Sequence, residues 1–461
     1  MRSGGNSRDP NNPQGLNAPA PGNDLVNRDI DSNTLQAGLR YAPPDQPLID
    51  LDAVFYYSRN SVSEAETSSP RVASRQVETF GFSADNRSSF ALTDRADLTL
   101  TYGGEFYTDD QIGRDSASAD GNRGGVPNAK TRFYGAFAQA ELNWQQPLGA
   151  PGALRFIPGI RWDRYESRAT GEPDLNDSAA SPKLALAYEP VPALMVFGNW
   201  SKGFRAPSFN EIFADDLHFQ IPNLGAFPPF PPQFVSNFFI TNADLVAEKS
   251  RNWEAGAGVD FDAIFADDDR FTAKASYYRA KIDNLIDLEV AIPAGCFGAP
   301  FPPCGSGAAF GNFSRFVNVA DAVLDGIEVE ASYSARYVYA HANFATIAGR
   351  NTATDAYVGS LSPKHLFIDG GVKLADGAMR LGTRLSVVGN FTKVNDPTLA
   401  RDSFTTADIY AVWQPRDGML EGLRVDLGID NVTDSAGEIV AAGVSQPGRN
   451  VKLALSWRQG F

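Results

Sequence analysis

A single histidine lies in a long phenylalanine-rich segment near the middle of the chain. His218 is the only histidine among residues 208 to 241. A neutral imidazole is a common axial ligand of haem iron, and neighbouring aromatic rings could cover an apolar porphyrin face. They could equally pack the segment on itself, so His218 is either a haem ligand or a loop histidine without a ligand. The aromatic candidates are Phe219, Phe227, Phe230, Phe234, Phe238 and Phe239.

Two cysteines, Cys296 and Cys304, lie in one stretch that is rich in glycine and proline. In an oxidising compartment so close a pair is expected to form a disulfide. Closing this small loop would restrict the unfolded chain by roughly 2–3 kcal/mol. Neither a histidine nor a third cysteine accompanies the pair, which argues against a metal site. We predict a disulfide that keeps a long loop compact.

The sequence contains no motif that indicates an enzyme. It has no G-x-S-x-G, P-loop, H-E-x-x-H or cysteine–histidine pairing. The paired carboxylates Glu328 and Glu330 fit the water-facing side of a strand better than acid–base chemistry. The remaining histidines, His341 and His365, are expected to be structural. A net charge of −15 argues against nucleic acid, whose phosphates require a basic surface.

The elements that must position these residues are strands with one apolar face and one polar face. Near the C-terminus, Val451, Leu453, Leu455 and Trp457 alternate with Lys452, Ala454 and Ser456. The same two-residue period occurs at residues 98–106 and 423–430. Alternation alone fits both a soluble sandwich and a barrel.

The lengths of the connections distinguish these two folds. Residues 43–47, 86–95 and 146–152 form short connections, whereas residues 58–74 and 108–131 form long ones. Short turns on one side and long loops on the other are typical of an outer-membrane barrel, whose strands need roughly 9–11 residues. No run of about 18 apolar residues provides a membrane helix. We predict an all-β, antiparallel transmembrane β-barrel in contact with outer-membrane lipid.

We expect about seventeen strands from the periodicity. Residues 1–35 are predicted to be a disordered or loop segment, without the apolar core of a signal peptide, and residues 36–461 to form the barrel. If Phe461 is periplasmic, the alternation of connections places residues before 36 outside, so we expect the C-terminal part of a larger barrel. The expected strands are 36–42, 49–57, 75–86, 96–107, 132–145, 153–165, 183–190, 193–204, 249–261, 268–290, 311–333, 336–347, 364–375, 378–389, 403–414, 422–430 and 449–459.

Several segments carry a family resemblance. Residues 199–212 read NWSKGFRAPSFNEI, residues 242–256 read NADLVAEKSRNWEAG, and residues 428–434 read GIDNVTD. Residues 318–320 with 324–330, and Gly448-Arg449 with the final Phe461, belong to the same set. In order and spacing these segments resemble TonB-dependent receptors of the Gram-negative outer membrane, from about residue 130 to 461.

This resemblance implies a barrel of 22 strands, a plug domain inside it, and transport driven by the inner-membrane TonB complex. The expected seventeen strands are about five fewer, and no plug or TonB-contacting segment is recognisable. We therefore expect the barrel portion of a receptor, truncated at its N-terminus, which would reach the TonB complex through a plug that this chain does not contain. No intrinsic cofactor is expected.

Two short boxes are similar to those of the haem and haemoprotein receptors of this family. The first is Phe204, Arg205, Ala206 and Pro207, and the second is Asn242, Ala243, Asp244 and Leu245, in which alanine replaces the usual proline. The resemblance implies that His218, between the boxes in an outer loop, is a ligand of haem iron. A ferric-siderophore receptor, a plugless passive pore and a non-functional gene fragment remain the alternatives.

Overall fold

The strands of the computed structural model fall into two sheets. The structure describes residues 2–10, 25–222, 234–290, 313–319, 321–358, 361–438 and 445–458. Eighteen described strands form one large sheet, and the other four form a small sheet. No helix among the described residues is long and apolar enough to cross a membrane.

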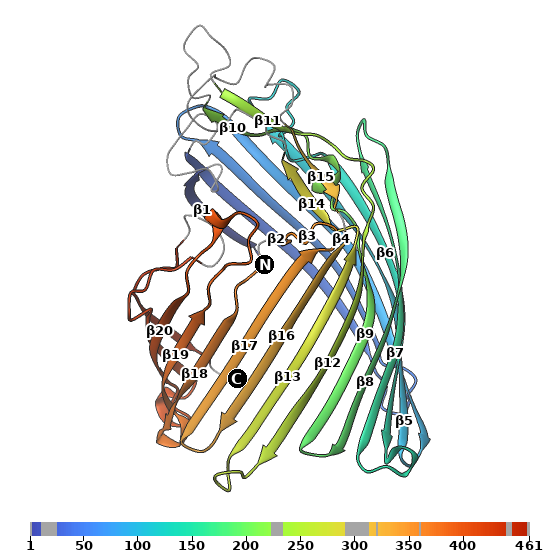
Figure 1. Ribbon diagram of the computed structural model, residues 1–461, viewed down its shortest axis with the longest axis vertical. Coiled ribbons are helices and arrows are strands. Elements are labelled where there is room, and N and C mark those ends of the chain that lie inside the picture. The colour runs from blue at the N-terminus through green and yellow to red at the C-terminus, as the bar shows by residue number, and fades with distance from the viewer. Residues whose placement is uncertain are drawn as a thin grey trace.

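The large sheet is an antiparallel meander that curls into a tilted barrel wall (Figure 1). Pairing runs from β1 to β9, passes to β12 and β13, and continues from β16 to β22. Its strands are β1 (Arg2–Pro10), β2 (Leu25–Tyr41), β3 (Leu51–Glu66), β4 (Val72–Thr93), β5 (Ala96–Asp115), β6 (Ala129–Gln145), β7 (Ala153–Ala169), β8 (Leu175–Val191), β9 (Leu194–Arg205), β12 (Glu248–Asp262), β13 (Arg270–Asp283), β16 (Ala322–Ser334), β17 (Val338–Asn351), β18 (His365–Leu374), β19 (Met379–Val388), β20 (Phe404–Trp413), β21 (Leu423–Asp430) and β22 (Asn450–Trp457).

All seventeen expected strands overlap strands of this sheet, and β1 is the eighteenth. Among the described residues no pairing joins β22 to β1, and all eight residues of β22 are exposed. The pairing of these strands confirms the predicted all-β fold with an antiparallel wall. The sheet has four strands fewer than the 22 that the resemblance implies.

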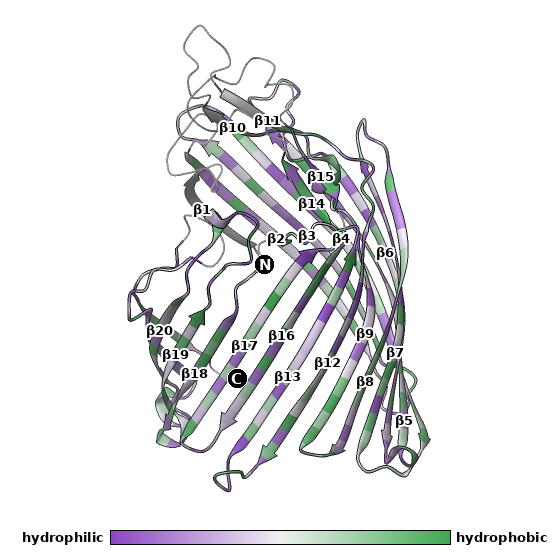
Figure 2. Ribbon diagram, viewed as in Figure 1, coloured by the Kyte–Doolittle hydropathy of each residue, from purple (hydrophilic) through white to green (hydrophobic). Residues whose placement is uncertain are grey.

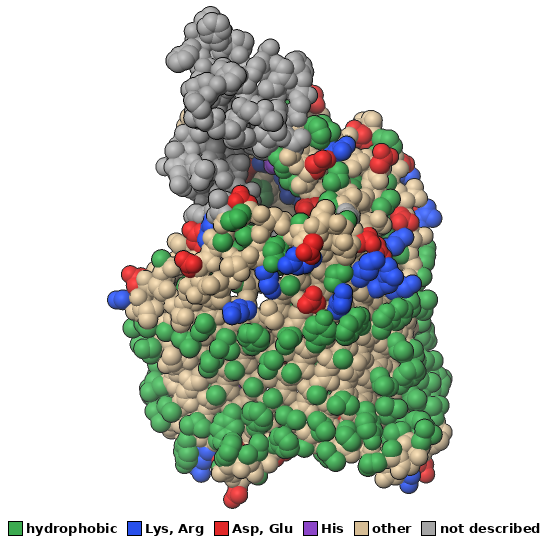
Figure 3. All heavy atoms as spheres, viewed as in Figure 1, with side chains coloured by type: hydrophobic (Ala, Val, Ile, Leu, Met, Phe, Trp, Pro, Cys, Tyr) green, Lys and Arg blue, Asp and Glu red, His purple; other side chains and the backbone are tan. Residues whose placement is uncertain are grey.

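The two faces of the wall differ in the way that the alternation predicts. Phe82 of β4 lies opposite Phe55 of β3 and Phe106 of β5, and it is 47% exposed on the outer face. Figure 2 shows the alternation along the strands, and Figure 3 shows a broad apolar belt across the lower half of the visible face of the molecule. Soluble monomers rarely expose so large an apolar surface, so this belt is the lipid-facing surface.

Polar side chains occupy the inner face. Arg161 of β7 pairs with Glu105 of β5, and its Nε lies 2.6 Å from Asp163 Oδ1. Ile327 of β16 is 43% exposed on the outer face. Because neighbouring residues of a strand point to opposite faces, Glu328 and Glu330 face the lumen, as predicted. Charges on the lipid side would cost roughly 2–4 kcal/mol for basic groups at the midplane, which explains this segregation.

In the part of the barrel that extends above the membrane, the structure differs from what the sequence predicts. Residues 1–35 were expected to be loop or disordered, but β1 covers Arg2–Pro10 and β2 begins at Leu25. Much of the predicted long loops 58–74 and 108–131 is likewise strand, because β3, β4, β5 and β6 extend into them. Beyond the hydrocarbon neither face must be apolar, so a strand there loses the alternation that would reveal it.

Two predicted strands are each divided between the two sheets. Residues 268–290 form β13 and β14 (Ile286–Val290), and residues 311–333 contain β15 (Phe313–Asn318) and β16. The first division occurs at Asn284, whose φ of 60° is incompatible with a continuing strand. The segments β14 and β15 therefore leave the wall and join the small sheet.

Candidate functional site

The small sheet brings together two loops at the upper rim of the barrel, the one between β9 and β12 and the one between β13 and β16 (Figure 1). It consists of β10 (Asp216–Pro222), β11 (Phe234–Phe239), β15 and β14 in that order. β10 and β11 form a hairpin, and β11 runs parallel to β15 through the pairs Phe238–Phe313 and Phe239–Ser314. The loop that carries His218 is thus joined to residues almost a hundred positions later in the chain.

His218 lies at an irregularity in β10, where the pairing register shifts between Leu217 and Phe219. Its Nδ1 is 2.9 Å from Ser314 Oγ and 3.3 Å from Asn237 Oδ1. The imidazole also packs against Phe239, with ring centroids 4.1 Å apart, and Phe239 stacks with Phe316 at 6.3 Å. One polar wall and one aromatic wall therefore hold the ring.

The hydrogen bonds around Nδ1 fit the tautomer of His218 that carries its proton on that nitrogen. Ser314 Oγ donates to Asn237 Oδ1 at 2.5 Å, so the hydroxyl proton is already used and Ser314 Oγ accepts from Nδ1–H. In this tautomer the lone pair is on Nε2. Histidines that bind a metal through one ring nitrogen usually donate the N–H of the other nitrogen to a polar group, which fixes the orientation of the ring. Burial lowers the pKa of His218, and the hydrogen bond to Asn237 offsets part of that effect. The lowered pKa favours the neutral form of the imidazole.

The first box builds a rim turn below this sheet. After β9, Ser208 begins the short helix α1 (Phe209–Phe213) with a reciprocal capping box to Glu211. Arg205 lies 3.0 Å from Glu211 Oε2 and 2.6 Å from Glu248 Oε1. Arg205 therefore ties α1 to the start of β12 and does not point freely into the lumen or the loop.

The second box closes the same structure from the other side. The Asn242 amide donates to Phe316 O at 2.7 Å, and its backbone N–H donates to Ile212 O at 2.8 Å. Leu245 is buried, whereas Asp244 is exposed at the rim. Ala243, which stands where the family has proline, is half-buried beside them. We call the buried apolar group at this place the rim cluster; its members are Ala129, Ile212, Phe213, Leu245 and Ile286.

Asn318 connects several segments of the rim, although its side chain was not identified from the sequence as part of the site. The Asn318 side chain accepts from Val246 N at 2.9 Å and donates to Val246 O at 2.9 Å and Asn284 O at 2.8 Å. It thus joins the second box to the place where β13 ends and β14 begins. Asn318 belongs to a recognised family segment, so only its side-chain role was missing.

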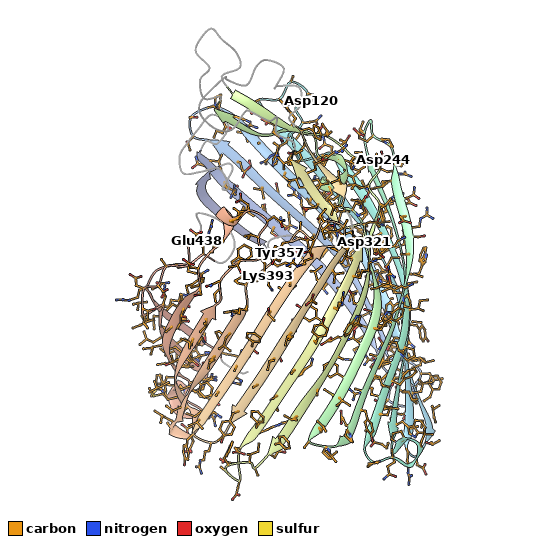
Figure 4. The ribbon with its side chains drawn as sticks, in the orientation of Figure 1. Asp120, Asp244, Asp321, Tyr357, Lys393 and Glu438 are labelled. Atoms are coloured by element: carbon orange, nitrogen blue, oxygen red, sulfur yellow. The ribbon has the colours of Figure 1, made fainter. Side chains whose placement is uncertain are left out.

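The other rim loops surround the mouth of the barrel (Figure 4). Asp120, Asp244 and Asp321 lie on the side near the small sheet, and Tyr357, Lys393 and Glu438 lie toward β18–β20. Loop-to-loop bonds hold this second group, including the pair of Glu438 with Arg401 at 2.6 Å. Described loop residues therefore lie at the rim on both of these sides.

Some predicted site residues lie outside the described part of the chain. These are Phe227, Phe230, the proposed disulfide partners Cys296 and Cys304, and the terminal Phe461. The backbones of Phe219 and Phe234 belong to β10 and β11, but their side chains are outside the description. The other two histidines belong to the barrel wall: the His341 ring lies 6.1 Å from the Tyr339 ring, and His365 Nε2 is 2.7 Å from Ser386 Oγ.

Comparison with known proteins agrees with this architecture. The "Hemin receptor" of Yersinia pestis is 24% identical over 450 residues, which cover 98% of this chain and 61% of the relative. The "Heme/hemopexin utilization protein C" of Haemophilus influenzae (strain 86-028NP) is 23% identical over 419 residues, covering 90% of this chain and 55% of the relative. The chain thus spans less than two thirds of the length of these curated relatives.

A solved structure shows the same fold. The Serratia marcescens hemophore receptor HasR, a double mutant in complex with its hemophore HasA and heme, superposes with a TM-score of 0.73 at 20% identity, covering 95% of this chain and 68% of that one. The family model described as "TonB dependent receptor-like, beta-barrel" matches residues 2–432. With nearly all of its length matched, and with the two boxes meeting at the rim, this chain belongs to the TonB-dependent receptor-like β-barrel family.

Proposed function

We propose that this chain forms the barrel portion of a receptor in the outer membrane of a Gram-negative bacterium, that the receptor takes up haem or a haemoprotein, and that His218 is an axial ligand of the iron. The observation that carries the proposal is the setting of His218. Its imidazole is oriented through Nδ1 by Ser314 and Asn237 and is flanked by the Phe239 ring. The printed names of the relatives, hemin receptor and heme/hemopexin utilization protein, support the same ligand class.

The two boxes contribute to this function by holding the loop in place. Arg205 and Asn242 bind protein groups on both sides of the rim cluster, and β10 follows α1 after only two residues. A fixed loop lowers the entropy cost of binding because the ligating side chain is already oriented. Energy for uptake would come from the TonB complex acting through a plug domain, as in the rest of the family.

Haemin binding tests the role of His218. We expect haemin, titrated into the 461-residue chain refolded in detergent, to give a red-shifted Soret band. His218→Ala should remove this shift and weaken binding at least tenfold, or about 1.4 kcal/mol. His341→Ala is the matched control, since that histidine lies in the barrel wall. An unchanged Soret shift in His218→Ala would contradict the assignment and favour a ferric siderophore, for which no histidine ligand is needed.

The pH dependence of haemin binding has a defined sign. Protonation of Nε2 removes the lone pair that binds iron, so acid should weaken binding, by about tenfold for each pH unit below the pKa. Because burial lowers the pKa of His218, this loss should begin below the ordinary histidine pKa of about 6.5. Titrations of wild type and His218→Ala between pH 8 and 4 would measure it. A loss that begins above pH 7, or one that persists in His218→Ala, would exclude this histidine as its source.

A further inference from the structure

Three arginines and one glutamate form a cluster on the inner wall near the upper rim. Glu64 of β3 accepts from Arg28 Nη2 of β2 at 2.6 Å through Oε1, and from Arg123 Nη2 at 2.5 Å through Oε2. The Glu64 side chain is only 7% exposed, and the side chains of Arg28 and Arg123 are 23% and 20% exposed. Both carboxylate oxygens are therefore already used by two arginines.

The third arginine, Arg75 of β4, has no such partner among the described side chains. Its Nε donates to the neutral Gln111 Oε1 at 2.8 Å, and no described carboxylate lies within 4.0 Å of its guanidinium group. Gln111 is itself completely buried, and its amide donates to Pro127 O and Asn210 Oδ1. Gln111 is thus fixed as an acceptor and adds no negative charge.

Arg75 and Arg123 are neighbours. Gly113 of β5 stands directly opposite Arg75 in the sheet, and a Cβ on Gly113 would lie only 3.1 Å from Arg123 Cβ. Arg75 thus places a guanidinium group that has no described carboxylate partner beside the Glu64–Arg123 ion pair, which leaves its positive charge uncompensated in a half-buried place. An uncompensated charge of this kind is costly in the protein alone, and an arriving anion would relieve the cost.

The cluster faces the lumen and adjoins the wall that carries His218. Phe80 and Phe82 of β4 are on the lipid face, so Arg75, an odd number of residues away, points inward. The loop of Arg123 reaches the small sheet, because Gly125 N donates to Asp215 O at 2.7 Å and a Cβ on Gly125 would lie 3.9 Å from the Phe239 ring. Phe239 in turn contacts the His218 imidazole.

We propose that Arg75 and Arg123 bind the propionate carboxylates of a porphyrin whose iron His218 holds. A guanidinium group matches a carboxylate through two parallel N–H donors, and a porphyrin of this kind has its two carboxylates on one edge and apolar surface elsewhere. The preferred substrate class is therefore a dicarboxylic porphyrin and not its neutral ester. This inference rests on the proposed function, but the carboxylates and the iron can be tested separately.

A comparison of the free acid with its ester measures the contribution of the carboxylates to binding. The use of a metal-free porphyrin removes any contribution of iron ligation. Metal-free protoporphyrin IX and its dimethyl ester are titrated into the refolded chain in a non-ionic detergent, with tryptophan quenching as the readout. Hydrogen bonds to charged groups predict that wild type prefers the diacid by about tenfold to a hundredfold. Arg75→Gln should lose most of this preference. Arg59→Gln should keep it, because Arg59 of β3 is half-exposed on the outer face.

The outcomes distinguish the two proposals. If wild type does not prefer the diacid, or if Arg75→Gln retains the full preference, the arginine site is wrong even where haemin gives a His218-dependent Soret shift. An Arg75-dependent preference without that shift supports the arginine site and overturns the iron ligand. Should Arg75→Gln not fold, wild type still decides, since added salt must weaken diacid binding and leave diester binding unchanged.

Discussion

Replacing Phe213 with alanine should detach the loop that carries His218 while the barrel remains folded. Phe213 is 2% exposed in the rim cluster, and truncation of a buried phenylalanine costs about 3–5 kcal/mol. That loss falls on α1 and the small sheet, because the membrane-spanning strands do not depend on this cluster. We expect rapid chymotrypsin cleavage after Leu217 or Phe219 and a parallel loss of haemin affinity.

A second phenylalanine provides the control for this experiment. Phe265 lies in the turn between β12 and β13 and is 81% exposed, so Phe265→Ala should leave both cleavage rate and haemin affinity unchanged. Far-UV circular dichroism would verify that all variants keep the barrel. If Phe213→Ala has wild-type protease resistance and haemin affinity, the rim cluster does not position His218.

The second large effect is expected in a turn on the opposite side of the barrel. Gly152, between β6 and β7, has a φ of 86°, and a Cβ there would overlap the backbone carbonyl of Glu189. Gly152→Ala thus combines left-handed strain of roughly 1–2 kcal/mol with overpacking of roughly 1–3 kcal/mol. We expect a large decrease in the urea midpoint of the chain folded into lipid vesicles.

The same turn contains a control for the strain alone. Gly149 has a φ of 85°, but nothing lies within 4 Å of its would-be Cβ. Gly149→Ala should therefore cost only the left-handed term, about 1–2 kcal/mol. Equal urea midpoints for the two alanine variants would show that the close approach to Glu189 does not matter.

The membrane-facing part of the fold could be predicted because lipid constrains it. Residues such as Phe80 and Phe82 must be apolar on the outer face, whereas Glu328 and Glu330 are tolerated only on the inner face. Because successive side chains of a strand point to opposite faces, this requirement produces a two-residue period in the sequence wherever a strand crosses the hydrocarbon. All seventeen strands predicted from that period overlap strands of the wall, although the predicted strands 268–290 and 311–333 each also include a strand of the small sheet.

The rim could not be predicted in the same way, because water imposes no such period. β10 and β11 lie within a segment predicted to be loop, and their pairing with β15 joins residues distant in sequence. Ser314 and Asn237 were therefore not recognised as partners of His218. The uncompensated charge of Arg75 could not be predicted either, because it depends on contacts of this β4 residue with Gln111 of β5 and with Arg123 in the loop that follows β5.

Location of the iron tests the central claim most directly. Crystals of the chain grown with haemin should show an anomalous iron peak next to His218 Nε2, at a bonding distance of about 2.0–2.1 Å for imidazole nitrogen, with the propionates toward Arg75 and Arg123. Crystals of His218→Ala grown under the same conditions should lack this peak. An iron peak elsewhere on the chain, or one that persists beside residue 218 in the variant, would contradict the account.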